Sequence, residues 1–277
     1  MPIKGIKGGV GTKALGYGLG AAEEETDPNF NQTVLLLHGD GSEGEGNTAA
    51  LGNPNYKAFK DNSTSAHALV VQGDAYGNDF SPYYYADGYW SVASDTTGIA
   101  EFSLTSDFDF TGDFTIEGWF WANSISLETS KYRSIFYDGV ATGSTQIYID
   151  GSNGKLGLYD ASVAQLLSAS AVPTGEWVHF AFVRSGSDSN NLSLYINGTR
   201  SSQATYTAGL IGSSGTAKIG CYTSSSGRWD GYISNLRFVK GSAVYSGASH
   251  TVPTTPLTAI TYTELLVCQS NRFIDNS

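Results

Sequence analysis

Short segments in which β-branched and aromatic residues alternate with polar ones begin near Asn29 and continue to the C-terminus. Turns rich in Gly, Asp, Asn and Ser separate them about every ten residues, a spacing typical of an all-β sandwich or barrel. No stretch keeps the period of about 3.6 residues that an amphipathic helix requires. The predicted strands are residues 33–37, 99–104, 114–121, 134–138, 146–149, 176–184, 191–197, 217–222 and 263–268.

The sequence NLSLYINGTRSS predicts a β-hairpin. From Leu192 to Ile196 hydrophobic and polar residues alternate, so one face of the first strand is apolar. Asn197-Gly198 then supplies the two residues with positive φ that a type I′ turn requires.

The sequence DGYISNLRFV also predicts a strand, but Ile233 falls out of phase with Leu236 and Phe238. A β-bulge, which inserts one extra residue into a strand, would restore the alternation. Downstream, Pro253 and Pro256 cannot join a central ladder because proline has no backbone N–H. We therefore expect the segment around them to run along the outside of the sandwich to the last strand.

The chain divides by composition into three parts. Residues 1–28 are an arm in which Gly recurs every two to four residues. Fully extended, such an arm reaches roughly 90 Å, so we expect an anchor rather than a domain. The sandwich is predicted to occupy residues 29–262. Residues 263–277 repeat the Thr-x-Leu-Leu strand, polar loop and aromatic-x-Asp-Asn-Ser motif of residues 33–63, and form either the final strand or the start of a second repeat.

The charge balance excludes some classes of partner. Charged residues make up 15% of the chain, and its net charge is −11. Nucleic acid is therefore excluded as a main partner, because its phosphates require clustered Lys and Arg. The chain has neither the roughly 20 apolar residues of a membrane helix nor a signal-peptide pattern, so we expect cytoplasmic synthesis, no secretion and no membrane insertion. Cys221 and Cys268 are too few for a disulfide scaffold.

No motif predicts catalysis. KGGVGTK, residues 7–13, has the wrong order for a Walker motif, and no G-x-S-x-G elbow is present. Jelly-roll glucanases carry paired carboxylates about 5 Å apart, written E-x-D-x-x-E, whereas Glu117 stands alone in a hydrophobic strand. His179 alternates with Trp177 and Ala181, and we expect it to face the opposite layer. We therefore expect a protein that is not an enzyme.

Six segments together resemble a known family: LHGDG, FKDNS, DFTIEGWFW, GEWVHFAFVR, LSLYINGTR and DGYISNLRFVKGSAVYSG. In this order they resemble a laminin-G-like, concanavalin A-like jelly-roll domain, similar to the version in structural proteins of marine tailed bacteriophages. The resemblance covers about residues 29–277. It implies a sandwich of two curved antiparallel sheets in virion fibres, decorations or adhesins, which often bind carbohydrate and are usually trimers.

The candidate functional residues follow from this resemblance and from their surroundings. Carbohydrate sites commonly stack an exposed aromatic ring on a sugar, and YTSSSGRW places Tyr222, Arg228 and Trp229 around one loop. Related lectin-like domains often hold a calcium ion with loop carboxylates, so calcium is the candidate cofactor. Its candidate ligands are Asp138, Asp188 and Asp230, with Asp40, Glu43 and Glu45. The arm resembles segments that fasten phage appendages to a capsid or tail, and its candidate contacts are Lys4, Lys7, Lys13 and Tyr17.

Three functions remain open. The first is a non-enzymatic virion structural protein, a head decoration or fibre, anchored to capsid or tail by its arm. The second is a lectin or adhesin whose main task is to bind host-surface glycans. The third, a glycoside hydrolase, lacks its carboxylate pair.

Overall fold

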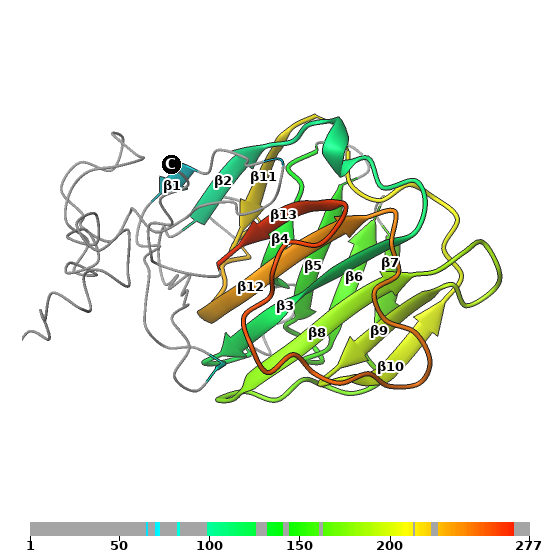
Figure 1. The fold of residues 1–277 in the computed structure, drawn as a ribbon. Helices are drawn as coiled ribbons and strands as arrows, with labels where there is room; N and C mark the ends of the chain where they lie inside the picture. The colour runs from blue at the N-terminus through cyan, green and yellow to red at the C-terminus, as the bar shows by residue number, and fades with distance from the viewer. Residues whose placement is uncertain are drawn as a thin grey trace, which may run out of the picture. The chain divides into compact units, whose positions relative to one another are not determined.

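Two antiparallel sheets face each other across a hydrophobic core (Figure 1). The computed structural model describes residues 65, 70–72, 82–83, 99–125, 132–140, 144–160, 163–212, 214–222 and 227–268, all within one unit that spans residues 43–272. The seven-stranded sheet contains, in spatial order, β1 (Val70–Gln72), β2 (Ile99–Ser103), β11 (Thr216–Ile219), β4 (Tyr132–Tyr137), β5 (Thr145–Asp150), β6 (Leu156–Asp160) and β7 (Val163–Leu167). The six-stranded sheet contains β10 (Thr199–Ala204), β9 (Leu192–Ile196), β8 (Trp177–Arg184), β3 (Phe114–Ala122), β12 (Gly231–Lys240) and β13 (Thr263–Val267).

The core forms because alternate residues of both sheets point inward. Phe120, Phe180 and Phe238 of the six-stranded sheet are fully buried, as is Phe136 of the seven-stranded sheet. The rings of Phe136 and Phe238 lie 4.9 Å apart, which joins the two layers. A single 3-10 turn, η5 (Ser106–Phe108), is the one helical element among the described residues, and no described helix is long and apolar enough to cross a membrane. The predicted all-β, two-sheet jelly-roll sandwich is confirmed.

Most predicted strands are present. The predicted β9–β10 hairpin turns at Asn197 and Gly198, which have φ values of 47° and 77°. The register between β12 and β3 shifts between Ser234 and Arg237, and Asn235 has a φ of 51°, which confirms the predicted bulge. Three observed strands, β1, β6 and β7, were absent from the sequence prediction.

Several sequence predictions lie outside the described residues. They include the strand at 33–37, the arm at 1–28 with Lys4, Lys7, Lys13 and Tyr17, and the acidic residues Asp40, Glu43 and Glu45. Residues 263–267 form β13, which pairs with β12, whereas residues 269–277 are not described.

Residues 241–262, which we call the strap, cross the outer face of the six-stranded sheet and return (Figure 1). On the way out, the strap bonds to Thr115 of β3 and reaches β10, where the amide of Arg200 donates to the carbonyl of Ala248. On the way back, the amide of Leu257 donates to the side chain of Asn235 in β12. The prediction that the proline-containing segment runs along the outside is confirmed.

Replacing Gly198 by Ala tests how tightly the strap is seated on the hairpin. A left-handed backbone costs a non-glycine residue about 1–2 kcal/mol. A methyl group at Gly198 would in addition collide with the carbonyl oxygen of His250 in the strap. Gly175 is the matched control, because its φ is 72° and a methyl group there meets nothing within 4 Å. Urea denaturation should show a clearly larger loss of unfolding free energy for Gly198→Ala than for Gly175→Ala, and equal losses would contradict the seating of the strap.

Candidate functional site

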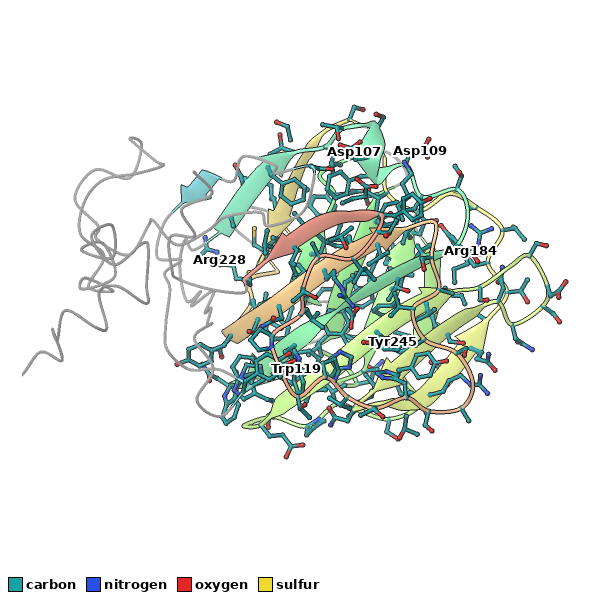
Figure 2. The ribbon with its side chains drawn as sticks, viewed as in Figure 1. Asp107, Asp109, Trp119, Arg184, Arg228 and Tyr245 are labelled. Atoms are coloured by element: carbon teal, nitrogen blue, oxygen red, sulfur yellow. The ribbon has the colours of Figure 1, made fainter. Side chains whose placement is uncertain are left out.

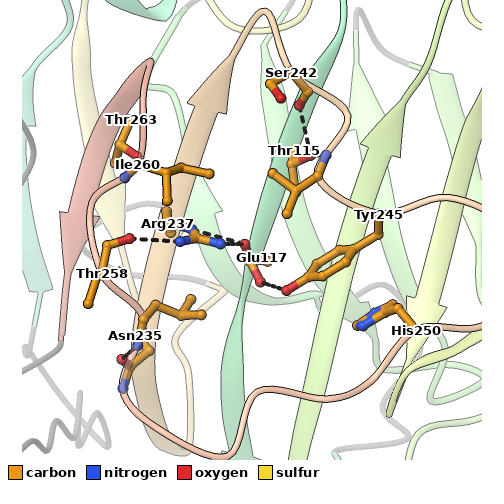
Figure 3. Close-up of polar contacts among 12 residues, drawn as sticks. Thr115, Glu117, Asn235, Arg237, Ser242, Tyr245, His250, Thr258, Ile260 and Thr263 are labelled. Carbon is orange, nitrogen blue, oxygen red and sulfur yellow. Dashed lines mark hydrogen bonds and ion pairs between the residues drawn. The ribbon is translucent and has the colours of Figure 1, made fainter.

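A buried charge lies between the six-stranded sheet and the strap (Figure 3). Glu117 of β3 is fully buried, and its Oε1 accepts a hydrogen bond of 2.9 Å from Nε of Arg237 in β12 and a second one from Nη2. The hydroxyl of Tyr245, on the strap, donates to Oε2 at 2.6 Å. Arg237 in turn donates through Nη1 to the carbonyl of Thr258, on the returning half of the strap, at 2.7 Å. Tyr245 lies over the middle of the sheet (Figure 2).

The surroundings of Glu117 keep it ionised. Burial by itself would raise the pKa of this carboxyl, but the contacts with His179, Arg237 and Tyr245 together hold the pKa below its usual range. Burial lowers the pKa of His179, so that imidazole is neutral at pH 7. A permanently charged, paired carboxylate without access to water is not a general acid. Glu117 is therefore a strand carboxylate whose hydrogen bonds are satisfied within the protein.

One prediction about the neighbouring histidine needs correction. His179 of β8 does not face the opposite sheet, because Val178 and Phe180 on either side of it occupy the core. Its Nε2 instead lies 3.4 Å from Oε2 of Glu117, on the face that the strap covers. His250 of the strap lies beside it, with a ring distance of 5.5 Å. The outer face of the six-stranded sheet is thus closed by aromatic, charged and imidazole groups that contact one another.

The outer face of the seven-stranded sheet has a different character. The register places Glu101, Lys218, Tyr137, Gln146 and Tyr159 in one row across β2, β11, β4, β5 and β6. Glu101 and Lys218 form an ion pair at one end of this row. The row therefore begins with this ion pair and ends with Gln146 between two tyrosines, Tyr137 and Tyr159.

Further tyrosines lie beside this row. The ring of Tyr222 is 4.6 Å from that of Tyr137, and the ring of Tyr132 is 4.7 Å from that of Tyr148. Tyr132 and Tyr222 are 41% and 37% exposed, whereas Tyr148 is buried. We call this set the tyrosine face: Tyr132, Tyr137, Tyr148, Tyr159 and Tyr222.

The hydroxyls of Tyr137 and Tyr148 are neutral at physiological pH. Burial, the proximity of Tyr222 and that of Asp138 raise the pKa of Tyr137. Burial also raises the pKa of Tyr148. A neutral phenol can both donate and accept a hydrogen bond while its ring offers an apolar surface. The face therefore combines rings with uncharged polar groups.

The structure separates the three residues that the sequence predicted to form a sugar site. Tyr222 lies on the tyrosine face, as described above. Trp229 is only 1% exposed and packs in the core at 5.5 Å from the ring of Phe120, so the prediction of an exposed stacking platform there is wrong. Arg228 is half-buried, and its carbonyl accepts a hydrogen bond from Nη1 of Arg133.

Sequence reasoning missed Tyr132, Tyr137, Tyr148 and Tyr159. A signal for one of them was present, because Tyr148 lies between Ile147 and Ile149, which both point into the core. Residues of a strand alternate between its two faces, so Tyr148 and Gln146 belong to the opposite face from these isoleucines.

Two of the calcium candidates, Asp138 and Asp230, have structural roles. Asp138 is buried and accepts hydrogen bonds from the amides of Val140 and Thr145, and burial raises its pKa to about 6. Asp230 accepts from Asn123 and Ser124, and Asp188 lies exposed in the turn between β8 and β9. In the part of the chain that the structure describes, no three His, Cys, Asp or Glu side chains are grouped to hold a metal ion.

The comparisons with known proteins agree with this fold. A laminin G-type family model, described as the concanavalin A-like lectin/glucanases superfamily, matches residues 94–243, more than half of the chain. The chain belongs to this superfamily. The matched segment contains strands of both sheets, from β2 to β12. No sequence among the curated proteins matches the chain.

Several solved structures are similar to this superfamily member. Domain 4 of AbnA, a GH43 extracellular arabinanase from Geobacillus stearothermophilus, solved with arabinotriose, is 16% identical over 70% of this chain and 93% of its own, with a TM-score of 0.48. A heptameric SAP-like pentraxin from Limulus polyphemus is 16% identical over 66% of this chain and 91% of its own, with a TM-score of 0.41. The binding domain of botulinum neurotoxin serotype C1 is 16% identical over 58% of this chain and 39% of its own, with a TM-score of 0.44. These similarities do not identify a ligand of this chain.

Replacing Glu117 by Gln tests the buried ion pair. The substitution leaves Arg237 charged, buried and without its counter-ion, so the free energy of unfolding should fall by about 3–5 kcal/mol. Glu101→Gln is the matched control, because the pair with Lys218 is partly exposed and contributes about 1 kcal/mol or less. Both values come from urea denaturation, and a Glu117→Gln variant as stable as the control would contradict a structural role for the pair.

Proposed function

We propose that this chain is a non-enzymatic carbohydrate-binding module. The observation that carries the proposal is the tyrosine face, because it is the polar aromatic surface that the strap does not occupy. Sugars offer apolar ring faces and many hydroxyls, and protein sites meet them with aromatic rings and uncharged hydrogen-bonding groups. Tyr132 and Tyr222, both exposed, are placed to make the first contacts with a ligand.

The acidic side chains near this face support binding rather than hydrolysis. Glycoside hydrolysis requires two carboxyl groups on either side of the scissile bond. Glu101 is paired with Lys218, and Asp150 accepts hydrogen bonds from Ser152 and Asn153 in a tight turn. Each carboxylate thus has a structural partner. Incubation with polysaccharides should release no reducing ends, and measurable release would contradict the non-enzymatic assignment.

Truncating the exposed tyrosines tests the binding face. An aromatic ring that stacks on a ligand contributes about 1–3 kcal/mol, so Tyr132→Ala and Tyr222→Ala should each weaken binding about tenfold or more in a glycan array followed by calorimetry. Tyr262→Ala is the control, because Tyr262 is 64% exposed but precedes β13 in the other sheet. If the array shows no glycan bound by the wild-type protein, or if all three variants bind equally, the proposal fails.

A second part of the proposal concerns where the module works. We propose that it is displayed on the surface of a tailed-bacteriophage virion, with residues 1–28 bound to a capsid or tail protein. Two observations support this role: the Gly-rich composition of the arm before a complete sandwich, and the resemblance of the sequence to phage structural proteins. A net charge of −11 keeps closely spaced copies soluble, which suits a decoration or fibre and the trimer expected from the resemblance.

Deleting residues 1–28 tests the display role. The deletion removes the proposed anchor and leaves all the described strands intact, so the shortened protein should remain folded by circular dichroism but no longer co-sediment with particles. Replacing Lys4, Lys7 and Lys13 together by Gln serves as the milder variant. Normal incorporation of the shortened protein would contradict an anchoring arm.

A further inference from the structure

We propose that Gln146 determines the specificity of the tyrosine face by donating a hydrogen bond to a hydroxyl of an uncharged, linear oligosaccharide that lies across the strands. The inference rests on the proposed carbohydrate-binding function. It adds two points to that function: the residue that selects the ligand, and the chemical class to which the ligand belongs.

The position of Gln146 is the first step. In the cross-strand register, Gln146 of β5 lies directly opposite Tyr137 of β4 on one side and Tyr159 of β6 on the other. The two tyrosines are half-buried, whereas Gln146 is 4% exposed. The amide therefore lies at the floor of the tyrosine face, between two rings.

The hydrogen bonding of Gln146 is the second step. Its Nε2 is buried and has no hydrogen-bond partner among the described residues. An unsatisfied buried donor costs about 1–3 kcal/mol, whereas an apolar side chain of the same shape carries no such cost. Stability alone would thus favour Met or Leu at this position. A destabilising polar group at the floor of a binding face is what a ligand-binding role predicts.

Other buried polar groups near this amide have hydrogen-bond partners. Thr145, the preceding residue in β5, donates to Asp160 and accepts from the amide of Ile211. Ser134 of β4, on the same face as Gln146, donates to the carbonyl of Phe136. These buried groups have partners within the protein. Nε of Arg133 in β4 is a second buried donor of this sheet without a partner among the described residues, but Nη1 of the same side chain donates to the carbonyl of Arg228.

The charges and dimensions of the row indicate the ligand class. Its charged members, Glu101 and Lys218, are paired with each other, so the row offers no net charge to an ionic ligand. From β11 to β6 the row crosses three gaps between strands, about 14 Å at the usual spacing of 4.7–4.9 Å. This span suits several linked sugar rings rather than one. The net charge of −11 further disfavours acidic polysaccharides.

The test compares stability with affinity in the full-length chain. Gln146→Met keeps the size of the side chain and removes its donor, and Gln146→Leu is a second apolar variant. The probes are neutral malto-, cello-, manno- and arabino-oligosaccharides, from the monosaccharide to the hexasaccharide, with oligogalacturonates as the acidic comparison. Isothermal titration calorimetry measures affinity, and thermal unfolding measures stability.

We expect affinity for one neutral series to rise with length up to the tri- or tetrasaccharide, with oligogalacturonates bound far more weakly. Gln146→Met should lower that affinity about tenfold or more while the melting temperature stays equal or rises. A purely structural Gln146 would instead lower the melting temperature without changing the affinity. Tyr262→Ala is again the control.

The outcomes separate this inference from the proposed function. If the wild-type protein binds and Tyr222→Ala weakens binding but Gln146→Met does not, the role of Gln146 is wrong and the tyrosine face remains. If the wild-type protein binds oligogalacturonates best, the ligand class is wrong. If it binds none of these sugars and no glycan on the array, the proposed function fails and this inference fails with it.

Discussion

The buried ion pair between Glu117 and Arg237 is the interaction that decides which surface of this sandwich is available. Two charges removed from water are tolerated only when they are paired and their remaining hydrogen bonds are satisfied. Here the two halves of the strap provide those bonds, Tyr245 to the carboxylate and the carbonyl of Thr258 to the guanidinium. The pair therefore fixes the strap to the sheet at two points, on its outward and its returning path.

This constraint gives the two sheets different roles. The six-stranded sheet is covered on both faces, by the opposite sheet and by the strap. The seven-stranded sheet shares the core but has an outer face of tyrosines around Gln146, whose donor has no partner among the described residues. The ion pair under the strap has its hydrogen-bond partners, whereas the amide donor of Gln146 on the other face has none among the described residues. This difference points to structure on one side and binding on the other.

The strands that could be predicted from the sequence are those with a clear period of two. The phase break at Ile233 was enough to predict the bulge, because the core residues Leu236 and Phe238 fix the register on its far side. β6 was missed because Gly157 interrupts its pattern, and a methyl group at that position would press against the ring of Tyr148. The glycine is thus required by packing across the strands, which one strand's sequence does not reveal.

The candidate site was less predictable, for two physical reasons. Trp229 follows a run of Ser and Gly, which is typical of an exposed loop, yet its ring turns inward and fills the core beside Phe120. Four residues of the tyrosine face, all except Tyr222, lie on β4, β5 and β6 and come together only through the cross-strand register. Likewise, Glu117 and Arg237 lie 120 positions apart in the chain, and their pairing follows from β3 and β12 being neighbours.

Amide hydrogen exchange with and without a bound neutral oligosaccharide tests the central claim most directly, because it maps the surface that a ligand protects. The account predicts slower exchange in β4, β5 and β6 around Gln146, with unchanged exchange in residues 241–262. Protection concentrated in the strap, with none in these three strands, would contradict it.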